Sequence, residues 1–361
     1  MRILFFCGSV EYGNDGVGDY TRLLCGELIR LGHEAQILSL CDPYVSEYLN
    51  EIQEVGGNKV VVNRLPLCYS HSKRYTIAQD IVAKYQPDWI SLQFVPYSFN
   101  PKGLPFWLPS FLNKLKGKYH WHVMFHELWL GIDREASFKH KCIGVLQKNI
   151  IKRVLGNISP KRINTQNELY LFSLKKCNIN ASVLPICSNI PLTGIKRGKK
   201  EITQFVLFGT IHPGAPFKDF IEDLVINKDS LSRPIKFFFI GKSGSELSSY
   251  KAVLHLFKID YEVLGIQAES VISQILIDSN YGISTTPYFQ TEKSGIYAAY
   301  KEHQLNSICV SRKWTPINGF HSTPQIIKYE KNNLDLISKG DMEVFDLSSI
   351  ANQFINSITI K

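Results

Sequence analysis

The first candidate for chemistry is a glycine-rich loop that follows the opening apolar run. Residues 13–21 read Gly-Asn-Asp-Gly-Val-Gly-Asp-Tyr-Thr and precede a stretch with helical spacing. A strand-to-helix loop of this kind favours an anion, because the first amides of a helix are unpaired and glycines let the backbone approach a ligand. The dinucleotide fingerprint is absent, since Thr21 occupies the position of its third glycine. Taken alone, the loop fits either a ligand site or a plain turn.

A second candidate anion site lies in the last third of the chain. Residues 284–287 (Ser-Thr-Thr-Pro) end an apolar run, and residues 292–295 (Glu-Lys-Ser-Gly) open a helical stretch. Backbone amides, a hydroxyl and an ammonium at a helix start suit a diphosphate. The alternative is a plain helix start that Ser294 caps. The glycine pair in 241–244 lacks the phosphate-loop spacing because position 236 is Lys, which disfavours a nucleoside triphosphatase.

A histidine lies where the sequence predicts the carboxyl edge of a sheet. His126 and Glu127 follow the apolar run 120–125, and open α/β sheets bind ligands at that edge. The alternative is a structural histidine. His120 and His122 alternate along the same run without a partnered Cys or Asp, so we expect no metal site. The sequence carries no Gly-x-Ser-x-Gly elbow and no catalytic cysteine motif.

Hydrophobic periodicity indicates the elements that position these residues. Short apolar runs alternate with longer amphipathic stretches, which is the pattern of βα units around a parallel sheet. We expect a helix at 20–31, where Leu recurs at helical spacing before Gly32 and His33 end it. Further helices are expected at 77–85 and 142–155. The strands expected in the first half are 2–7, 35–40, 59–65, 89–93, 120–125, 162–166 and 182–184.

A second series of βα units follows a break in this pattern. Residues 185–202 hold Pro, Gly and a basic cluster without periodicity, so we place a hinge there. The cluster, Lys196, Arg197, Lys199 and Lys200, fits a solvated linker or a binding patch. The second series consists of strands at 204–208, 235–240, 261–264, 281–284 and 307–310, with a helix at 295–303 and a helical tail at 345–358. We therefore expect an N-terminal domain at 1–190, a C-terminal domain at 191–344 and a helix at 345–361 that packs back on the first domain.

Composition indicates a globular protein with an anionic partner. The 361 residues are 44% hydrophobic and 20% charged, which provides for large cores and excludes a disordered or collagen-like chain. The formal charge of +9 favours a phosphorylated ligand, a nucleic acid or an anionic membrane surface. The eight cysteines form no CxxC pair, and we interpret them as reduced core residues. Without a signal sequence or a spanning run, we expect a cytoplasmic protein, free or peripheral on the inner face of the plasma membrane.

Taken in order, several blocks resemble the glycosyltransferases of the GT-B fold, and within them the large retaining group called family 4. Residues 16–34 resemble that group's opening loop, first helix and Gly-His end. Residues 88–94 and 123–127 resemble its next two blocks, while 207–214 and 282–295 occupy its donor-side positions. The resemblance implies an α/β protein of GT-B type: two Rossmann-like, doubly wound domains that face each other across a cleft, with a C-terminal helix that crosses back to the first.

The resemblance also implies roles for individual residues. Transfer from a nucleotide-sugar releases a diphosphate, which helix amides and cations can stabilise without a metal. His126 would orient the sugar or support the transition state, and Asp19 would contact the acceptor hydroxyl or cap the helix. The nucleobase would lie near 265–267. The residues expected to bind the donor are Gly16, Gly18, Gly209, Thr210, Lys218, Gly265, Ile266, Gln267, Glu292, Lys293, Ser294 and Gly295.

One motif of the family is degenerate in this chain. The usual Glu-x7-Glu donor motif would place acids at Thr291 and Ala299, whereas Glu292 and Glu302 lie out of register. Recognition of the sugar and the ribose must then depend on other groups.

The resulting hypothesis is a hexosyltransferase that moves a sugar from a nucleotide-sugar, UDP- or GDP-linked, to a glycan or lipid-linked acceptor in bacterial polysaccharide or cell-surface glycan synthesis. The resemblance implies retention of configuration, and we expect no cofactor besides the donor substrate. Aromatic residues in 94–107 and Phe111 fit membrane attachment or a core. The alternatives are a GT-B nucleotide-sugar epimerase, a non-catalytic partner subunit and a nucleic-acid-binding protein, although no aromatic-basic RNA motif or helix-turn-helix signal accompanies the charge.

Overall fold

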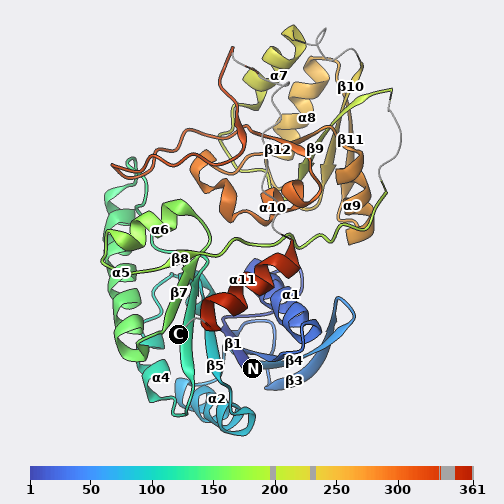
Figure 1. Cartoon of the computed structure of the whole chain (residues 1–361). Helices are drawn as coiled ribbons and strands as arrows, with labels where there is room; N and C mark the ends of the chain where they lie inside the picture. Colours follow the sequence, from blue (N-terminus) through green and yellow to red (C-terminus); the bar gives the residue numbers. More distant parts are fainter. Residues whose placement is uncertain (196–200, 228–232, 333, 335–345, 360–361) are drawn as a thin grey trace. The chain divides into compact units, whose positions relative to one another are not determined.

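Two β-sheets organise the chain, one in each of the two units into which it divides (Figure 1). The computed structural model describes residues 1–195, 201–227, 233–332, 334 and 346–359. Unit 1 consists of Met1–Pro185, Pro316–Phe320 and Leu347–Lys361, and unit 2 of Ile186–Thr315 and His321–Asp346. The basic cluster Lys196, Arg197, Lys199 and Lys200 lies outside the described residues.

Unit 1 contains an eight-stranded sheet in the order β3-β4-β2-β1-β5-β6-β7-β8. Neighbouring strands are parallel except β3 and β4. The central strands read as continuous apolar runs because both of their faces are buried. The strands are β1 (Arg2–Cys7), β2 (Glu34–Asp42), β3 (Leu49–Val55), β4 (Asn58–Pro66), β5 (Trp89–Phe94), β6 (His120–Phe125), β7 (Arg162–Thr165) and β8 (Ser182–Val183).

The helices of unit 1 begin earlier than hydrophobic periodicity predicts, because polar caps precede the apolar residues. The first helix begins at Gly16 rather than at residue 20, since the Asp15 carboxylate accepts hydrogen bonds from the amides of Val17 and Gly18. Ser70 and Ser137 cap the next two long helices in the same way. The helices are α1 (Gly16–Arg30), α2 (His71–Tyr85), α3 (Pro96–Phe99), α4 (Leu108–Lys114), α5 (Phe138–Ile158) and α6 (Glu168–Lys175).

The β3–β4 hairpin was not expected from the sequence. Strand β3 pairs antiparallel with β4, and Gly56 and Gly57 make the turn at φ values of +55° and +78°. Both values lie in the left-handed region that glycine adopts without steric cost. The Gly-Gly pair is therefore the sequence signal for this hairpin. The hairpin adds one antiparallel edge strand, β3, to an otherwise parallel sheet.

The last helix, α11 (Leu347–Thr359), belongs to unit 1. Figure 1 shows it beside α1, and Arg30 of α1 donates a hydrogen bond to Ser348 at 3.3 Å. Its Phe354 packs against Phe5 of β1, with the ring centroids 5.7 Å apart. This return of the chain agrees with the fold class that the sequence indicates.

Unit 2 contains a fully parallel six-stranded sheet in the order β11-β10-β9-β12-β13-β14. Aromatic side chains fill its core, where the ring of Phe205 stacks between Phe237 and Tyr281 at centroid distances of 5.0 and 4.8 Å. Its strands are β9 (Thr203–Phe208), β10 (Ile235–Ile240), β11 (Asp260–Gly265), β12 (Tyr281–Ser284), β13 (Asn306–Cys309) and β14 (Ile327–Lys328). Its helices are α7 (Phe217–Ile226), α8 (Leu247–Leu256), α9 (Glu269–Asp278), the 3-10 helix η2 (Tyr288–Lys293) and α10 (Gly295–Glu302).

One expectation about burial needs correction. The cysteines are all free, but Cys68 and Cys142 are exposed because they lie outside the apolar runs that form the core. The aromatic run 94–107 is divided: Phe94, Phe99 and Phe111 are buried, whereas Phe106 and Tyr97 are exposed. Over the described residues, no helix is both long and apolar enough to cross a membrane.

Candidate functional site

Each sheet has a switch point, the place where successive strands leave the first strand in opposite directions. In unit 1 the chain runs from β1 to β2 on one side and later to β5 on the other. In unit 2 it runs from β9 to β10 on one side and later to β12 on the other. Ligands of open α/β sheets bind beyond the carboxyl ends of the strands at such points. The segments that follow β1, β5 and β6, and those that follow β9 and β12, therefore form the candidate site of each unit.

His126 follows β6 at this edge of unit 1 and is 3% exposed. Its Nε2 lies 2.7 Å from Oε1 of Gln93, which can only accept, so Nε2 carries the proton. Its Nδ1 accepts a hydrogen bond from Nε2 of Gln166 at 2.6 Å. Tyr20 of α1 packs edge-on against the ring at 5.0 Å. Both ring nitrogens are therefore occupied by side-chain amides, and the imidazole is fixed as the neutral Nε2–H tautomer.

The contact with Gln93 continues as a chain of hydrogen bonds across the sheet. Gln93 donates to Ser91 at 2.7 Å, and Ser91 lies 2.7 Å from Nδ1 of His122. His122 donates from Nε2 to Oδ1 of Asn164 at 2.9 Å, and the Asn164 amide donates to Ser182. These side chains come from β5, β6, β7 and β8, so the chain joins four neighbouring strands inside the core.

Burial decides the protonation of both histidines. Burial, with a smaller contribution from the nearby His122, lowers the pKa of His126 to about 3. It also lowers the pKa of His122 to about 4, against a smaller opposing effect of the hydrogen bond to Asn164. Both imidazoles are thus neutral at physiological pH.

The loop after β1 is closed by its own carboxylate. Asp15 accepts hydrogen bonds from the amides of Val17 at 2.9 Å and Gly18 at 3.0 Å, and from the hydroxyl of Ser9. An ideal Cβ on Gly18 would lie 2.8 Å from Cα of Val10, whereas one on Gly16 would meet nothing within 4 Å. Gly18 is therefore required for the close approach of α1 to the Ser9–Val10 backbone. The first amides of α1 bind a protein carboxylate where the sequence suggested a ligand anion.

Asp19 lies in the first turn of α1 but does not cap it, because Asp15 does. Its carboxylate pairs with the guanidinium of Arg22 and accepts the amide of Gly13 at 3.2 Å. Burial raises the pKa of Asp19, and the charge of Arg22 opposes that change. The Arg22 guanidinium also lies 4.7 Å from the ring centroid of Tyr12. Asp19 thus ties the loop to the helix.

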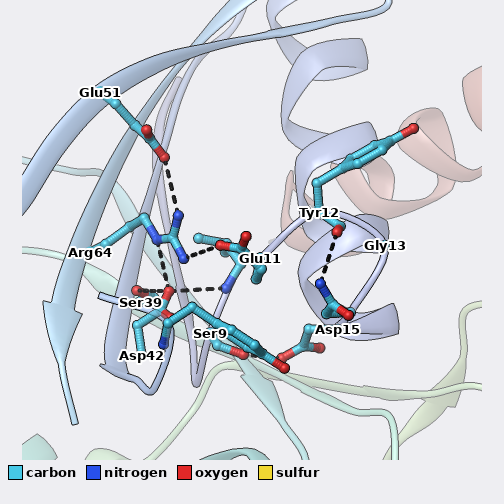
Figure 2. A network of polar contacts seen from close by, with 12 residues as sticks. Ser9, Glu11, Tyr12, Gly13, Asp15, Ser39, Asp42, Glu51 and Arg64 are labelled. Carbon is cyan, nitrogen blue, oxygen red and sulfur yellow. Dashed lines mark hydrogen bonds and ion pairs between the residues drawn. The ribbon is translucent and has the colours of Figure 1, made fainter. Parts of the chain in front are cut away.

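Arg64 of β4 anchors the same loop from the neighbouring strands. Figure 2 shows its guanidinium between three carboxylates, with Asp42 at 2.9 Å, Glu11 at 2.5 Å and Glu51 at 3.5 Å. Asp42 is fully buried and also accepts the amide of Val10 at 3.4 Å. A buried arginine with several acceptors fixes geometry, because each lost partner would leave a charge uncompensated. The loop from Ser9 to Asp15 is therefore held from both of its ends.

The candidate site of unit 2 is a small cleft at the carboxyl ends of β9 and β12. Its enclosed volume is about 10 Å³, the space that one water molecule needs, and the cleft is open to solvent. One side is formed by Gly209 and Thr210, which follow β9, and another by Ser284, Thr285 and Thr286 at the end of β12. Leu207, Phe208, Ile211, Ile283 and Ile296 complete the lining. A cleft of this size with hydroxyl walls suits one polar group of a larger ligand.

Cationic residues surround this cleft. His212 donates its backbone amide to Oγ1 of Thr285 at 2.9 Å, and its Nδ1 lies 3.3 Å from the same oxygen. Burial lowers the pKa of His212, and the charges of Lys293 and Arg312 lower it further. A neutral imidazole that accepts from Thr285 at Nδ1 carries its proton on Nε2. Lys293 and Arg312 therefore provide positive charge near the hydroxyl groups, and the neutral His212 provides one N–H donor.

Two serines at this cleft lack the partners that a purely structural role requires. The hydroxyl of Ser284 is buried, with the residue 2% exposed, and has no hydrogen-bond partner among the described residues. Ser294 is the residue before α10, but its side chain makes no capping hydrogen bond. The alternative of Ser294 as a helix cap is therefore wrong. The start of α10 and the Ser284 hydroxyl are available to a ligand in a way that the start of α1 is not.

The other residues expected to bind a donor are spread over unit 2. Lys218 is 62% exposed in α7 and lies 3.8 Å from Glu222 rather than in the lining of the cleft. Gly265 ends β11 and accepts the amide of Gly241 at 2.6 Å; Ile266 is 73% exposed. Gln267 folds back on the carbonyl of Leu264. Glu292 and Lys293 end η2, and Gly295 begins α10.

Several residues of both sites were missed by sequence reasoning. Gln93 is the second-last residue of β5 and Gln166 directly follows β7, so their places near strand ends are a usable signal of the same kind as that of His126. Arg312 lies beyond β13 and no spacing points to it. Ser284 was included in a quoted block but not singled out. Among the described residues, no group of three His, Cys, Asp or Glu is placed to hold a metal ion.

Comparison with known proteins identifies the fold. No protein-family model matches the chain, and no curated protein matches it in sequence. Solved structures do match. WaaG, a glycosyltransferase of lipopolysaccharide biosynthesis, matches with a TM-score of 0.52 and 10% identity over 85% of this chain and 80% of its own. The catalytic domain of starch synthase IV from Arabidopsis thaliana, bound to ADP and acarbose, matches with a TM-score of 0.51 and 12% identity over 100% and 92%.

A third match is HepE from Anabaena in complex with UDP and glucose, with a TM-score of 0.50 and 12% identity over 99% of this chain and 90% of that protein. Together with two sheets that are parallel except for one edge strand, these matches show the GT-B fold that the sequence blocks indicate. At such low identity the likeness extends to the fold alone.

Proposed function

We propose that the protein is a glycosyltransferase that moves a sugar from a nucleotide-sugar to a glycan or lipid-linked acceptor. The observation that carries this proposal is the cleft of unit 2, where the buried hydroxyl of Ser284 has no partner among the described residues and the neutral ring of His212 lies near the charges of Lys293 and Arg312. A diphosphate is the part of a nucleotide-sugar that such a site would recognise. WaaG, starch synthase IV and HepE share the fold, and the last two were solved with ADP and UDP respectively.

The chemistry follows from the leaving group. Breaking the bond between the sugar and the diphosphate leaves negative charge on the phosphate oxygens while the anomeric carbon becomes electron-poor. In this proposal Lys293 and Arg312 neutralise that charge, and Nε2–H of His212 and the Ser284 hydroxyl donate hydrogen bonds to it. The amides at the start of α10 add the positive end of a helix dipole. We propose that this set makes the reaction metal-independent.

In unit 1 we propose that His126 acts as a positioning residue. Because its nitrogens bind Gln93 and Gln166, a sugar at this edge would meet the amides rather than the imidazole. Gln166 donates its amide nitrogen to His126 and keeps its carbonyl oxygen as an acceptor for a substrate hydroxyl. The pairing of Asp19 with Arg22 favours a structural role for that carboxylate.

The family, the donor and the biological role are proposed from the sequence blocks that resemble family 4 glycosyltransferases. We propose membership of the retaining family 4 with a degenerate Glu-x7-Glu motif, a UDP- or GDP-linked donor and a role in bacterial polysaccharide or cell-surface glycan synthesis. Thr291 and Ala299 occupy the motif positions, and both are fully buried. The hydroxyl of Thr291 donates to the carbonyl of Tyr288. Ribose recognition would therefore come from residues other than these two.

We also propose that unit 1 contacts an anionic membrane surface from the cytoplasm. Helix α5 carries five Lys and Arg and no acid in its 21 residues. Phe138 at its start is 84% exposed, and Val145 and Leu146 further along are also exposed. Exposed apolar side chains among cations are the features that bind a helix to an anionic bilayer interface.

The donor site is tested by measuring nucleotide binding by calorimetry with UDP, GDP, ADP and CMP. Arg312→Ala and Lys293→Ala are each expected to weaken binding of the preferred nucleoside diphosphate by about tenfold or more, since hydrogen bonds to charged groups contribute about 1.5–3 kcal/mol. Lys218→Ala, whose ammonium faces Glu222, serves as the comparison and is expected to have a smaller effect.

The outcomes separate the alternatives. Binding of one nucleotide series together with sugar transfer to an acceptor supports the proposal. Interconversion of the donor without any acceptor would instead identify an epimerase. Absence of nucleotide binding would overturn the proposal in favour of a non-catalytic subunit, and steep salt-dependent binding of oligonucleotides would favour a nucleic-acid partner.

A further inference from the structure

A groove lies on unit 1 between α2 and the outer strands of the sheet. Its floor is formed by Gln36 of β2 and by Val61 and Asn63 of β4. One wall consists of Tyr48 and Asn50, at the start of the hairpin. The other consists of residues on one face of α2: Ile77, Asp80, Ile81, Lys84 and Tyr85. The groove has a volume of about 530 Å³, which is the scale of a ligand site.

The groove is separate from the candidate site at the carboxyl edge of the same sheet. Gln36 lies near the start of β2, and Lys84 and Tyr85 lie at the end of α2, which runs antiparallel to the strands. The hydroxyl of Tyr85 lies 3.4 Å from the carbonyl of Ile3, at the start of β1. His126, in contrast, follows the end of β6. The groove therefore opens toward the amino ends of the strands.

The two faces of the outer strands differ in what covers them. Asn50 pairs with Asn63 across the hairpin, and both side chains point to the α2 side. The residues that alternate with them, Glu51 and Arg64, point to the opposite side and join the network of Figure 2. That network saturates the polar groups of its face, whereas the α2 side holds polar groups beside an open space.

Asn63 is the clearest of these polar groups. It is 3% exposed, and its carbonyl oxygen accepts hydrogen bonds from the hydroxyl of Tyr48 at 2.8 Å and from Asn50 at 2.7 Å. Its amide nitrogen makes no hydrogen bond within the described part of the chain. The side chains of Gln36, Asp80 and Lys84 likewise have no hydrogen bond or ion pair with described residues. Because Asn63 lines the groove, the donors of its amide nitrogen are open to a molecule that binds there.

From this arrangement we infer that the groove is a binding site for a neutral saccharide, distinct from the proposed donor and acceptor sites. Amides of Gln36 and Asn63 offer both donors and acceptors at short range, which matches the density of hydroxyl groups on a sugar ring. The ring of Tyr48, with Val61, Ile77 and Ile81, offers apolar surface for the C–H face of the sugar.

The charges and the lining argue against other ligand classes. Asp80 and Lys84 are the charged side chains of the lining, and their charges cancel. A phosphorylated ligand would need several cations, and a lipid chain would leave the Asn63 and Gln36 amides unpaired in an apolar contact. The inference does not depend on the glycosyltransferase proposal, because the groove belongs to unit 1 alone and needs no nucleotide.

The test is calorimetry of the full-length protein, without nucleotide, against maltotriose, cellotriose, chitotriose and xylotriose. We expect at least one of these trisaccharides to bind, and the double variant Asp80→Ala/Lys84→Ala to weaken that binding by about tenfold, as the loss of one or two hydrogen bonds would. Tyr48→Ala should also weaken binding, whereas Tyr48→Phe keeps the ring and should retain most of it. The matched control Lys251→Ala/Asp260→Ala removes the same two charge types from exposed positions in unit 2 and should leave binding unchanged.

Three results would overturn the inference. The first is that none of the four trisaccharides binds at millimolar concentration. The second is binding that the groove variants do not weaken. The third is binding that UDP abolishes by competition, because it would place the saccharide at the donor site. Nucleotide binding is measured on the same groove variants and should persist in them. The saccharide inference can therefore fail while the proposed glycosyltransferase function stands, and the reverse also holds.

Discussion

His126 donates a hydrogen bond from Nε2 to Oε1 of Gln93 over 2.7 Å, although 33 residues separate the two in the chain. The contact joins the carboxyl ends of β6 and β5, and Gln166 holds the other ring nitrogen from the end of β7. A histidine at the edge of an α/β sheet is often considered a proton donor or acceptor. Here its two amide partners and its burial make it a fixed neutral ring.

The stability of unit 1 is expected to fall as pH decreases from about 6.5 toward 4. The folded-state pKa values of His126 and His122 are lowered to about 3 and about 4, while both rings have a pKa near 6.5 when unfolded. The unfolded chain then binds protons in this window that the folded chain does not, so protonation favours unfolding. Each site lowers the free energy of unfolding by up to about 1.4 kcal/mol per pH unit.

Urea unfolding at pH 7, 6, 5 and 4 measures this dependence, and nitrogen NMR of the folded protein should show both rings neutral at pH 5. His122→Gln removes one of the titrating groups and should reduce the slope. An imidazolium signal from either ring at pH 5 would contradict the prediction.

Two glycines in the first turn of α1 should respond oppositely to alanine. A Cβ on Gly18 would approach the Val10 and Ser9 backbone to 2.8 and 2.9 Å, so Gly18→Ala should destabilise the fold by about 1–3 kcal/mol. Gly16→Ala meets nothing within 4 Å and should stabilise it by up to about 1 kcal/mol, because alanine loses less backbone entropy in a helix. Thermal unfolding of the two variants checks the signs, and equal effects would refute the packing argument.

Glu302 is expected to make unit 2 less stable as pH rises from about 4.5 to 7. Burial, with a smaller contribution from the charge of Asp346, raises the pKa of Glu302 to about 7. The folded chain therefore binds a proton in this window that the unfolded chain has released, which favours the folded state at the lower pH. Glu302→Gln should flatten this part of the profile and raise the melting temperature at pH 8. The measurement is thermal unfolding followed at pH 5 and pH 8, and a variant with an unchanged difference between them would argue against a titrating Glu302.

If α5 contacts an anionic membrane surface, binding of the protein to vesicles should depend on the charge of the lipids and of α5. The protein should sediment with phosphatidylcholine vesicles that contain phosphatidylglycerol and not with phosphatidylcholine alone. Lys139→Glu/Lys141→Glu, at exposed positions of α5, should weaken this binding by about tenfold or more, since each basic residue near an anionic surface contributes about 1 kcal/mol. Lys175→Glu/Lys251→Glu makes the same change of net charge elsewhere and should have a smaller effect. Equal losses in both variants would indicate a general charge effect instead of a contact through α5.

The sequence by itself determined the alternation of strands and helices, the break between the two βα series and the presence of His126 at a strand end. These features depend on local periodicity, because a strand or helix buries its apolar residues at fixed spacing. Local reasoning placed the start of α1 four residues too late, since the capping carboxylate of Asp15 lies outside the apolar pattern. It also missed β3, whose alternation is weak at an exposed edge.

Only the tertiary structure decided which polar groups meet. The partners of His126 are 33 and 40 residues away, and those of Arg64 come from three different segments. Such pairings depend on the order and register of the strands. Strand order brings together residues that lie far apart in the sequence, and no local spacing predicts these contacts. The same order separates Lys218 from the cleft near Lys293, and it leaves the amide nitrogen of Asn63 in a groove without a partner among the described residues. Local physics therefore specified the elements, and long-range strand order specified the sites.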